Sequence, residues 1–517
     1  MSKSSLPDPS GGREPSVDPL EAEDAEDRRP SLGQSLIPVV FLIAMLAASV
    51  YLFGGDSSYG PNQIALLLAA SVGFLVGMSN GFGWKEMEQG VVHSIGLAMG
   101  AILILLVVGS LIGTWIMAGI VPTMIYYGLQ VLHPSIFLPA ACIICAVVSL
   151  ATGSSWTTVS TIGIALIGIA GALDLSLALA AGAIISGAYF GDKLSPLSDT
   201  TNLAPAMVGT DLFTHIRHML WTTVPSMVIA LILYTVIGIF SHTSGQAPDL
   251  GSFLTALQDS FTIGWYLLIP PAIVLLLVLR KVPAFPALLI GALVGGLFAI
   301  IFQTDLVLRF ADPEGQLHPA WALVKGFWTA LHGDLSATPL IASGNEDLDA
   351  LLNRGGMYSM LNTVWLILSA MVFGGVMEVT GMLQRLSQAI LGFAHSTGTL
   401  ITATLATSIG SNIIASDQYI AIVLPGRMFR AEFERRGLHP KNLSRCMEDA
   451  GTLTSPLIPW NTCGAFMSAT LSVATFTYLP FCFVNLLNPV ISAFYGFTGF
   501  TIERIEPEGK RDLNQAA

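Results

Sequence analysis

Two aspartates, two prolines and a run of hydroxyl side chains stand together in residues 191–209, which read GDKLSPLSDTTNLAPAMVG. The flanking sequence is apolar enough for a membrane interior, so this stretch cannot be a plain transmembrane helix. Asp192 and Asp199 would each cost about 2.5–3.5 kcal/mol at the centre of an inserted helix. A bound cation is the simplest compensation for two such carboxylates, and the stretch therefore predicts an ion-binding site.

Three further polar interruptions carry the same kinds of oxygen atom. They are LATGSSWTTVSTIG at 150–163, LATSIGSNIIAS at 405–416 and SPLIPWNTCGAF at 455–466. Unwound backbone within a bilayer survives only where it is buried in protein or lines a water-filled cavity, so we expect all four interruptions to meet in one cavity. Freed carbonyls can coordinate a cation there while Ser, Thr, Asn and Asp side chains complete its shell, which suits sodium and protons.

The candidate ion- or proton-binding residues share a polar oxygen at or beside one of these interruptions. We expect sodium at Asp199 and neighbouring oxygens, with Asp192 as the second choice of carboxylate. The full set is Asp199, Asp192, Ser195, Ser198, Thr200, Thr201, Asn202, Ser154, Ser155, Thr157, Thr158, Ser411, Asn412, Asp417, Glu448, Asp449, Ser455, Asn461 and Thr462.

Several of these acids also have a structural interpretation. Asp199 can cap the helix that resumes at Thr201, and Asp192 can pair with the adjacent Lys193. Asp417 can be shielded by backbone amides inside a hairpin.

Two groups beside the interruptions are harder to place. Glu448 and Asp449 precede the fourth interruption, but they follow a basic loop that can leave them in solvent at the cytoplasmic mouth. His215 and His218 follow the first break and are expected on the cytoplasmic surface.

Composition identifies the class of protein that must position these residues. Of 517 residues, 53% are hydrophobic and 11% are charged, against about 25% charged in ordinary soluble domains. An apolar helix of about 20 residues spans a bilayer. The candidate spans are 35–54, 62–80, 94–118, 219–241, 262–280, 283–302, 357–381 and 476–498. We therefore expect an all-α polytopic membrane protein with lipid as its surroundings; the net charge of −12 is interpreted as solvation, and no nucleic-acid partner is expected.

An internal duplication organises the interruptions. In each half, a hydroxyl-rich break precedes a proline-bearing break: Gly153 and Ser195 are 42 positions apart, and Gly410 and Ser455 are 45 apart. The loop 425–445 is rich in arginine and lysine, so it is expected in the cytoplasm. Under that topology the two hairpins enter from opposite sides, which is the relation expected of inverted repeats.

The same pattern sets the expected boundaries and location. They are a disordered acidic cytoplasmic tail (1–33), a first membrane repeat (34–241), a linker (242–261), a second membrane repeat (262–498) and a cytoplasmic C-terminal tail (499–517). The extramembrane loop 303–356 falls outside, where the stretch around Trp321 and Trp328 can lie along the interface as an amphipathic helix. We expect a multi-pass protein of the cell (inner or plasma) membrane with both termini in the cytoplasm.

Two long segments give the sequence a resemblance to a known family. GAYFGDKLSPLSDTTNLAPAMVGTDLFTHI (187–216) resembles the signature of NhaC-type sodium/proton antiporters, and MEDAGTLTSPLIPWNTCGAFMSATL (447–471) is similar to the same family. The resemblance covers about residues 35–500. It implies the ion-transporter superfamily fold, with two inverted-topology repeats that each contain a re-entrant hairpin and a broken transmembrane helix, and commonly a homodimer. Where Asp199 would align in the second repeat stands Pro459, which leaves a second equivalent ion site open.

The resemblance implies a secondary active transporter that exchanges sodium for protons through a buried carboxylate. Similar proteins include carriers that exchange protonated malate for sodium and lactate, and carriers suspected of moving amino acids, so a small carboxylate substrate or an amino acid is the alternative. No basic side chain beyond Lys193 is evident near the breaks to bind an organic acid. We expect no enzyme and no cofactor, with sodium ions and protons as the transported species; a channel is the competing class, which only flux coupling distinguishes.

Overall fold

The computed structural model describes residues 30–53, 59–241, 250–335 and 352–505, together with Arg28, Ser57, Pro339, Leu340 and Asp349. Within this part of the chain every regular element is a helix, and Leu438 and Arg504 form an isolated antiparallel bridge. The all-α fold expected from composition is thereby confirmed. The expected tails lie largely outside the described residues, which leave out 1–27 and 506–517. Of the expected linker 242–261, residues 242–249 lie outside the described part and Leu250–Ser260 form helix α12. The boundaries of tails and linker stay predictions.

Eight helices among the described residues are long and apolar enough to cross a membrane, and two bent pairs raise the number to ten. The eight are α2 (Leu32–Phe53), α3 (Pro61–Ser79), α4 (Trp84–Met117), α6 (Pro134–Thr152), the run α7–η2–α8 (Ser155–Thr158, Val159–Gly163 and Ile164–Ala172), α11 (Leu212–Ser241), α14 (Ala284–Phe302) and the run η5–α18 (Met357–Met360 and Leu361–Val379). The bent pairs are α12 (Leu250–Ser260) with η4 (Trp265–Leu268) and α13 (Ile269–Leu279), and α24 (Thr475–Tyr478) and η8 (Leu479–Phe481) with α25 (Phe483–Thr498). The chain is therefore a multi-pass membrane protein.

Each span expected from the sequence coincides with one of these helices, but two spans were missed. Helix α6 and the run α7–η2–α8 lie where the sequence suggested a single interrupted segment. Their hydroxyl-rich junction lowers the apparent apolar length, although each arm is long enough to span a bilayer.

The outer faces of the long helices expose large apolar side chains. Val40 and Ile43 on α2 are 61% and 58% exposed, and Leu297 and Ile301 on α14 are 53% and 54% exposed. Apolar faces of this extent on spanning helices are stable against lipid rather than water. Polar side chains gather inside instead, which is the arrangement a transport protein needs.

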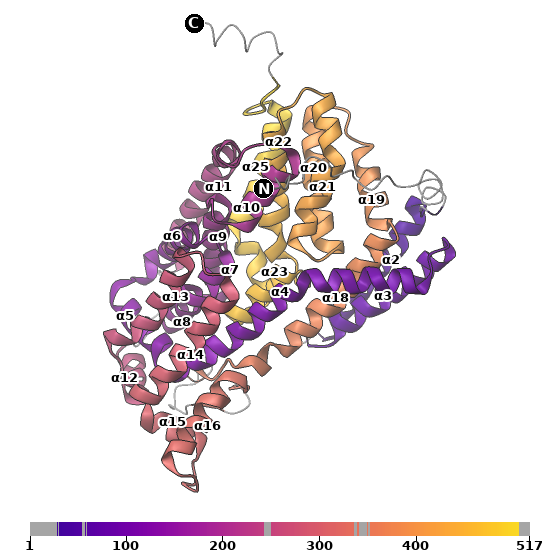
Figure 1. The fold of residues 1–517 in the computed structure, drawn as a ribbon. Helices are drawn as coiled ribbons and strands as arrows, with labels where there is room; N and C mark the ends of the chain where they lie inside the picture. The colour runs from indigo at the N-terminus through magenta and orange to yellow at the C-terminus, as the bar shows by residue number, and fades with distance from the viewer. Residues whose placement is uncertain are drawn as a thin grey trace, which may run out of the picture.

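Helices from the two halves of the chain pack in matching pairs. Helix α4 packs on α14 while α18 packs on α3, and α4 and α18 pack on each other. Likewise α6 packs on α11 and α20 (Thr397–Ile414) packs on α25. Figure 1 shows α4 and α18 running obliquely between the α2–α3 pair and the remaining helices. These matching contacts agree with a duplicated chain; the inverted relation between the halves stays a prediction.

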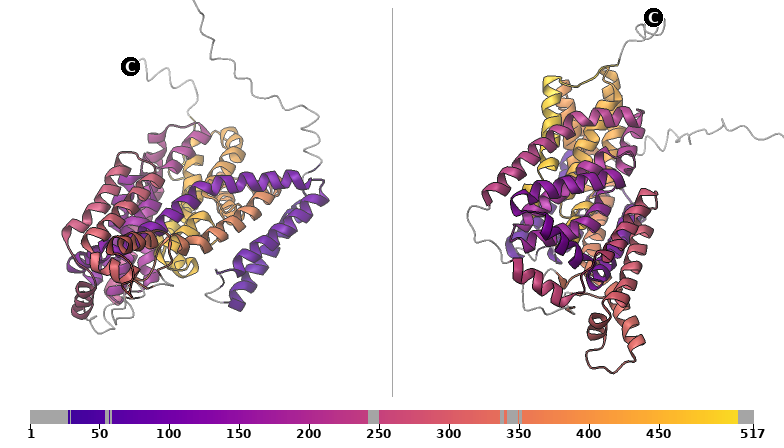
Figure 2. Two further views of the ribbon diagram at one scale, coloured as in Figure 1. Left: turned by 60° about the horizontal axis from the view of Figure 1, so that its bottom comes forward. Right: turned by 90° about the vertical axis from the view of Figure 1, so that its left-hand side faces the viewer.

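Helix α4 is unusually long for a spanning helix. Its 34 residues rise by about 51 Å, well beyond the ~30 Å thickness of a hydrocarbon core. A helix of this length must tilt or extend past the bilayer, and Figure 2 shows α2, α3 and α4 reaching out to one side of the molecule. Helix α4 therefore forms a long surface against which α14 and α18 pack.

The first helical hairpin comprises α6 and the run α7–η2–α8. Gly187 and Gly191 on α9 (Leu177–Leu194) lie against Cys142 and Ala146 on α6. Since both residue numbers increase together, α6 and α9 point the same way, so residues 155–172 must return between them. Helix α9 ends at Leu194, and α10 (Asp199–Val208) starts after a four-residue break at 195–198.

The second half repeats this order. Helix α19 (Met382–Leu391) leads into α20, which turns back into α21 (Gln418–Arg435) to form the second hairpin. The broken helix consists of α22 (Pro440–Met447), the π-helix η6 (Glu448–Thr452) and η7 (Ser455–Leu457), and after the break at 458–461 it continues as α23 (Thr462–Leu471). Both halves thus present a hairpin followed by a discontinuous helix.

The segment expected as an extramembrane loop contains helices of its own. They are α15 (Thr304–Ala311) and α16 (Pro319–His332), and α5 (Ile120–Val131) is the remaining short helix of the first half. Trp321 and Trp328 are 69% and 65% exposed on α16, while Phe327 packs against Gly296 of α14. An amphipathic helix with aromatic side chains on its outer face is the expected form of this stretch.

Candidate functional site

The tip of the first hairpin is a glycine followed by a serine cap. Gly153 has φ +71°, and a Cβ there would lie 2.7 Å from the backbone of Leu197 in the first break. Ser154 then caps α7, accepting a hydrogen bond from the Thr157 amide at 3.1 Å. The glycine therefore allows the hairpin tip to approach the first break closely.

Asp192 is the carboxylate held by this tip. Its Oδ2 accepts hydrogen bonds from the Ser155 amide at 3.0 Å and from the Ser155 hydroxyl at 2.6 Å. Asp192 is 7% exposed and lines a cavity. The alternative that Asp192 pairs with Lys193 is wrong, because Lys193 is bonded to Asp449 instead.

Asp199 occupies a more open position than expected. Helix α10 begins at Asp199 itself, and the N-cap residue is Ser198, whose side chain makes no capping hydrogen bond. The alternative that Asp199 caps a helix starting at Thr201 is therefore wrong. Its side chain is exposed on the cavity wall, next to the Ser198 and Thr200 hydroxyls, which lie 3.2 Å apart.

Three other polar residues near the first break hold the backbone rather than facing the cavity. The Thr201 hydroxyl donates to the Lys193 carbonyl at 3.0 Å, and the side-chain amide of Asn202 donates to the Ser198 carbonyl at 2.7 Å. Ser195 accepts from the Leu197 amide at 3.3 Å. In the first hairpin, Thr158 likewise donates to the Ser154 carbonyl at 2.9 Å. These side chains fix the shape of the helix breaks.

The tip of the second hairpin lies later in the chain than the glycine chosen from the sequence. Helix α20 continues through Gly410 to Ile414, and the turn is made by Ser416, with φ +61°, and Asp417. Asp417 caps α21 by accepting from the Tyr419 and Ile420 amides at 2.9 and 3.1 Å. It also lines the cavity, so the carboxylate has both a structural contact and access to the site.

Amide side chains fasten the second hairpin to its broken helix. Asn412 donates to the Gly451 carbonyl at 2.7 Å and to the Thr454 hydroxyl at 3.0 Å. Asn461 caps α23 and donates to the Asn412 side-chain oxygen at 3.1 Å. Ser411 donates within its own helix, to the Thr407 carbonyl. None of Ser411, Asn412 and Asn461 is among the residues that line the cavity.

The two halves share one further bond at equivalent positions. In the second half, the Ser455 hydroxyl donates to the Gln418 side-chain oxygen at 3.1 Å across 37 positions. In the first half, Ser155 donates to Asp192, also across 37 positions. In each half, the residue directly after the cap of the hairpin tip (Ser155 or Gln418) is hydrogen-bonded to a residue near the end of the helix that precedes the break (Asp192 or Ser455). By this geometry Ser455 is the counterpart of Asp192.

The helix starts after the two breaks also correspond. The caps Ser154 and Ser198 are 44 positions apart, and the caps Asp417 and Asn461 are also 44 apart. The counterpart of Asp199 is therefore Thr462, not Pro459 as the sequence comparison suggested. Relative to these caps, the shared SPL motif lies three positions earlier in the second half than in the first, so a comparison anchored on that motif pairs the wrong residues.

One cavity of about 880 Å³ is lined by residues from three of the four interruptions, as expected, and by Asp417, which directly follows the interruption at 405–416. The predicted residues that line it are Ser154, Ser155, Thr157, Asp192, Ser198, Asp199, Thr200, Asp417 and Thr462. The carboxylates and hydroxyls on its wall are the oxygen ligands that suit a cation. Any such cation would need the hydroxyls as well, because no group of three His, Cys, Asp or Glu side chains in the described part of the chain could hold a metal ion.

The sequence missed several residues of the cavity wall. Gln418, Tyr419 and Cys463 come from the second half, and Lys281 comes from the turn between α13 and α14. Lys281 is exposed, with φ +63°. It lies 82 positions from Asp199 along the chain, so nothing in the local pattern connected this lysine with the breaks.

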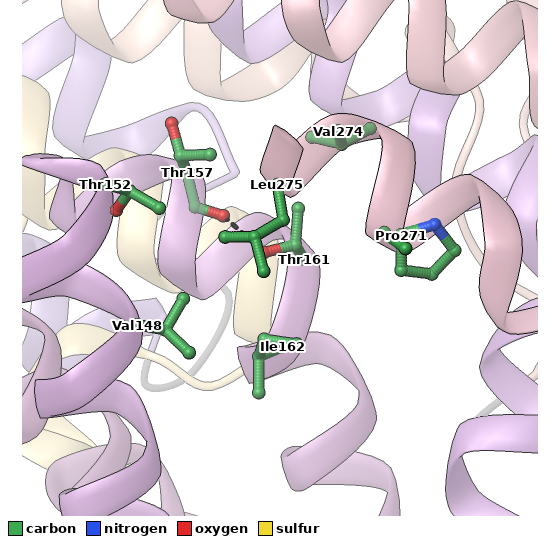
Figure 3. Close-up of a pocket in the computed structure, with 9 residues that line it drawn as sticks. Val148, Thr152, Thr157, Thr161, Ile162, Pro271, Val274 and Leu275 are labelled. Carbon is green, nitrogen blue, oxygen red and sulfur yellow. Dashed lines mark hydrogen bonds between the residues drawn. The ribbon is translucent and has the colours of Figure 1, made fainter. Parts of the chain in front are cut away.

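A smaller cavity of about 110 Å³ lies beside the first hairpin and shares Thr152 and Thr157 with the larger one. Figure 3 shows Thr157 and Thr161, joined by a hydrogen bond of 2.7 Å, facing Val274 and Leu275 of α13. The hairpin arm is therefore incompletely packed against α13.

Glu448 and Asp449 lie outside the cavity lining and are fully buried. The alternative that they sit in solvent at the cytoplasmic mouth is therefore wrong. Asp449 is bonded to Lys193 and accepts from the Thr222 hydroxyl at 2.9 Å. Arg445 lies 3.6 Å from the second oxygen of Asp449.

The histidines of α11 are also buried. His215 and His218 are 0% and 5% exposed, so the expectation of a surface position is wrong. His215 Nδ1 lies 2.8 Å from the Ser444 hydroxyl. Helix α11 packs against α22, which places both histidines at the interface between the two broken helices and their neighbours.

Comparison with known proteins connects this arrangement to transporters. The model of the Na+/H+ antiporter family matches residues 187–500. The chain is 39% identical over 476 residues to the Na(+)/H(+) antiporter NhaC of Alkalihalophilus pseudofirmus, covering 92% of this chain and 97% of that protein. It is 39% identical to the Malate-2H(+)/Na(+)-lactate antiporter of Bacillus subtilis, covering 91% and 96%, and 35% identical to the Arginine/ornithine antiporter ArcD of Halobacterium salinarum, covering 95% and 97%.

Proposed function

The chain belongs to the Na+/H+ antiporter family, and from that premise we propose that it is a secondary active transporter that exchanges sodium for protons. The observation that carries this function is the cavity at the four helix breaks, which is lined by Asp192, Asp199 and Asp417. Discontinuous helices that meet around carboxylates are the usual construction of ion sites in secondary transporters.

Sodium binds between the first hairpin tip and the start of α10. Asp192 and Asp199 supply charge, and the hydroxyls of Ser154, Ser198 and Thr200 are oxygen donors on the same wall. Asp192 is oriented by Ser155 before any ion arrives, which reduces the cost of assembling the site. Asp199 is exposed, so it is the carboxylate that an entering ion meets first.

Exchange follows from the cost of moving an unbalanced carboxylate through a hydrophobic barrier. An empty, ionised site carries a penalty of several kcal/mol inside the membrane, whereas a site holding sodium or a proton largely avoids it. The protein therefore changes the side that its cavity faces when it carries sodium or a proton, and not when it carries neither. One ion must bind before the other is returned, which is the definition of antiport.

A second candidate function is the exchange of an organic substrate. Two observations favour it: the cavity volume of about 880 Å³ far exceeds the space one sodium ion needs, and Lys281 is a cation on its wall. Sites for small organic molecules occupy about 300–1,000 Å³. The names of two relatives, a malate/lactate antiporter and an arginine/ornithine antiporter, belong to this class of substrate.

One assay separates the two functions. The purified protein is reconstituted in proteoliposomes with a pH dye inside, and sodium, lithium, potassium, and sodium with malate, lactate or arginine are added outside. A pH change with sodium chloride alone that is lost in Asp192→Asn supports sodium/proton exchange. A response that needs an organic acid or amino acid, and is lost in Lys281→Gln, moves the function to the second candidate.

The remaining features of the transporter are part of the same proposal. The protein lies in the cell membrane with both termini in the cytoplasm, its two repeats are inverted, and it assembles as a homodimer. The basic residues that cluster at Arg427, Arg430, Arg435 and Arg436 support this orientation. Protease or cysteine-labelling accessibility of that loop in sealed vesicles, and the mass of the purified protein in detergent, test orientation and dimerisation.

A further inference from the structure

A second group of charged side chains is buried away from the cavity lining, at the contact between the broken helices. Lys193 of α9 and Asp449 of η6 form a fully buried ion pair between residues 256 positions apart. Lys193 also donates to the Asn488 side-chain oxygen of α25 at 3.1 Å. This pair joins the first half of the chain to the second, directly behind Asp192.

The charges in this group are distributed unevenly. Asp449 faces both cations, Lys193 and Arg445, and also receives the Thr222 hydroxyl. Glu448, the next residue, is 0% exposed, and neither of its carboxyl oxygens has a hydrogen-bond partner among the described residues. Thr452 is a polar neighbour of Glu448 within the same π-helix, but its hydroxyl is also without a hydrogen-bond partner there.

A buried carboxylate without partners carries a heavy desolvation cost, whereas a carboxylic acid carries much less. Glu448 therefore sits in this structure as a group that holds a proton. It lies on η6, a single π-helical turn, and such turns occur frequently at functional sites. Geometry and environment together make it suited to proton transfer.

The groups around η6 identify how Glu448 communicates with the cavity. Lys193, Asp192 and Asp449 are the charges that act on it electrostatically. The elements packed against η6 are α9, α10, α11, α20, α21, α22, α25 and η7. The buried or cavity-facing titratable groups of these elements are Tyr189, Asp192 and Lys193 of α9, Asp199 of α10, His215, His218 and Tyr234 of α11, Asp417 and Tyr419 of α21 and its cap, and Arg445 and Cys446 of α22.

We propose that Glu448 carries the exchanged proton, at a site separate from the sodium cavity. This inference rests on the proposed sodium/proton exchange and assigns its proton. When sodium binds at Asp192, it offsets the negative charge that acts on Glu448, so the O–H bond of Glu448 breaks more readily and the proton leaves to the aqueous side that the protein faces. By linkage, a proton on Glu448 weakens sodium binding by the same factor.

Two transport measurements on one set of variants test this assignment. Exchange of radioactive sodium for unlabelled sodium requires the cavity but no proton, whereas the sodium-driven pH change requires both. For Glu448→Gln we expect sodium/sodium exchange within about twofold of wild type and a pH signal lowered by about tenfold or more. Glu88→Gln, which removes an exposed carboxyl in the second turn of α4, is the matched control and should behave as wild type in both assays.

The other outcomes overturn the assignment in distinguishable ways. A Glu448→Gln protein that still moves protons when sodium is added overturns it, and so does a correctly folded variant that loses both activities. A wild-type protein that moves sodium but no protons overturns the proposed function itself.

A spectroscopic measurement keeps the assignment testable if Glu448→Gln fails to fold. Infrared difference spectra of the wild type on addition of sodium should show the loss of a protonated carboxyl band. Glu448→Asp should shift that band while keeping part of the exchange. A sodium-induced band that is unchanged in Glu448→Asp, or the absence of any such band in the wild type, would show that the proton resides elsewhere.

Discussion

The hairpin tips of the first and second halves have nearly the same backbone but different side chains. Both hairpins turn through a residue with φ above +60°, Gly153 or Ser416, and both then begin a helix with a capping side chain. At the cap the first half has a hydroxyl, Ser154, and the second has a carboxylate, Asp417. The same architecture therefore carries different ligands.

At the ends of the broken helices, the carboxylate lies in the first half and the hydroxyl in the second. The first half has the carboxylate Asp192, and the second has the hydroxyl Ser455 at the equivalent position. Each half thus contributes one carboxylate to this pair of positions, but in swapped places. Asp199 adds a third carboxylate on the first half alone, since its counterpart is Thr462.

This difference teaches that the duplication preserved the frame of the site and not its charge. Backbone geometry at a helix break is set by caps, close packing and left-handed residues, which several residue types can supply. The charge that binds a cation depends on single side chains. Under the proposed function, the first half is therefore the one expected to bind sodium, while a hydrogen bond between the Asn412 and Asn461 side chains secures the second.

The largest expected effect comes from Asp192→Asn. It removes the carboxylate that Ser155 orients while keeping its shape, so sodium-driven proton movement in proteoliposomes should fall about 100-fold or to background. The counterpart substitution, Ser455→Ala, removes one hydrogen bond worth about 1 kcal/mol and should keep most of the activity. Equal losses from both substitutions would show that the halves contribute equally, contrary to the comparison.

Substitution of the left-handed residues should separate the two hairpin tips. Gly153→Ala places a Cβ in a left-handed conformation and 2.7 Å from the Leu197 backbone, which should destabilise the protein by about 1–3 kcal/mol. Ser416→Gly relieves a non-glycine residue of φ +61° and should be neutral or stabilising. Thermal unfolding in detergent measures both, and a Gly153→Ala protein as stable as the wild type would mean that the first tip is free to move away from the break.

The capping role and the charge of Asp417 can be tested separately. Asparagine caps a helix about as well as aspartate. Asp417→Asn should therefore have a free energy of unfolding within about 0.5 kcal/mol of the wild type, although it removes one charge from the cavity. We expect the sodium concentration for half-maximal exchange to rise about fivefold, less than the effect of Asp192→Asn, because the proposed sodium site is built on Asp192 and Asp199 of the first half. An unchanged sodium dependence would assign Asp417 to structure alone.

Much of the frame was predictable from the sequence because it depends on strong local signals. Each apolar run of membrane length proved to be a span, although α6 and the run α7–η2–α8 were missed, and three of the four hydroxyl- and proline-bearing interruptions line one cavity as predicted. Asp192 and Asp199 stood out since carboxylates within apolar sequence are costly. These signals are properties of short stretches of chain.

What the sequence did not provide was the set of partners. Lys193 pairs with Asp449 and not with its neighbour, because adjacent side chains on a helix point in different directions. Lys281 reaches the cavity from a turn far along the chain. Asp199 is the first residue of α10 and not its cap, because the helix begins one residue earlier than it would if Asp199 were the cap. Long-range packing decides each of these, and single-sequence patterns carry no trace of it.

The smallest expected effect concerns the exits of the two hairpins. The second hairpin leaves through the charged end of α21, where hydrogen bonds from Arg435 and Arg436 lower the pKa of Glu432 to about 2. The first leaves through the uncharged α8 (Ile164–Ala172). Because the unfolded pKa of glutamate is about 4.3, the bonds to Glu432 stabilise the folded protein fully above that pH and are lost as the pH falls toward about 2.

Glu432→Gln should therefore lower stability by about 0.5 kcal/mol at neutral pH, the usual size for an exposed pair. The difference from wild type should shrink as the pH falls below about 4, because the carboxylate of the unfolded wild-type chain takes up a proton there while that of the folded protein does not. Exchange should be unchanged at neutral pH, because Glu432 lies outside the cavity lining. Thermal unfolding at neutral pH and near pH 3, alongside the proteoliposome assay, measures both. A loss of exchange in this variant would mean that the exit of the second hairpin takes part in transport, so that the two halves differ in motion as well as in charge.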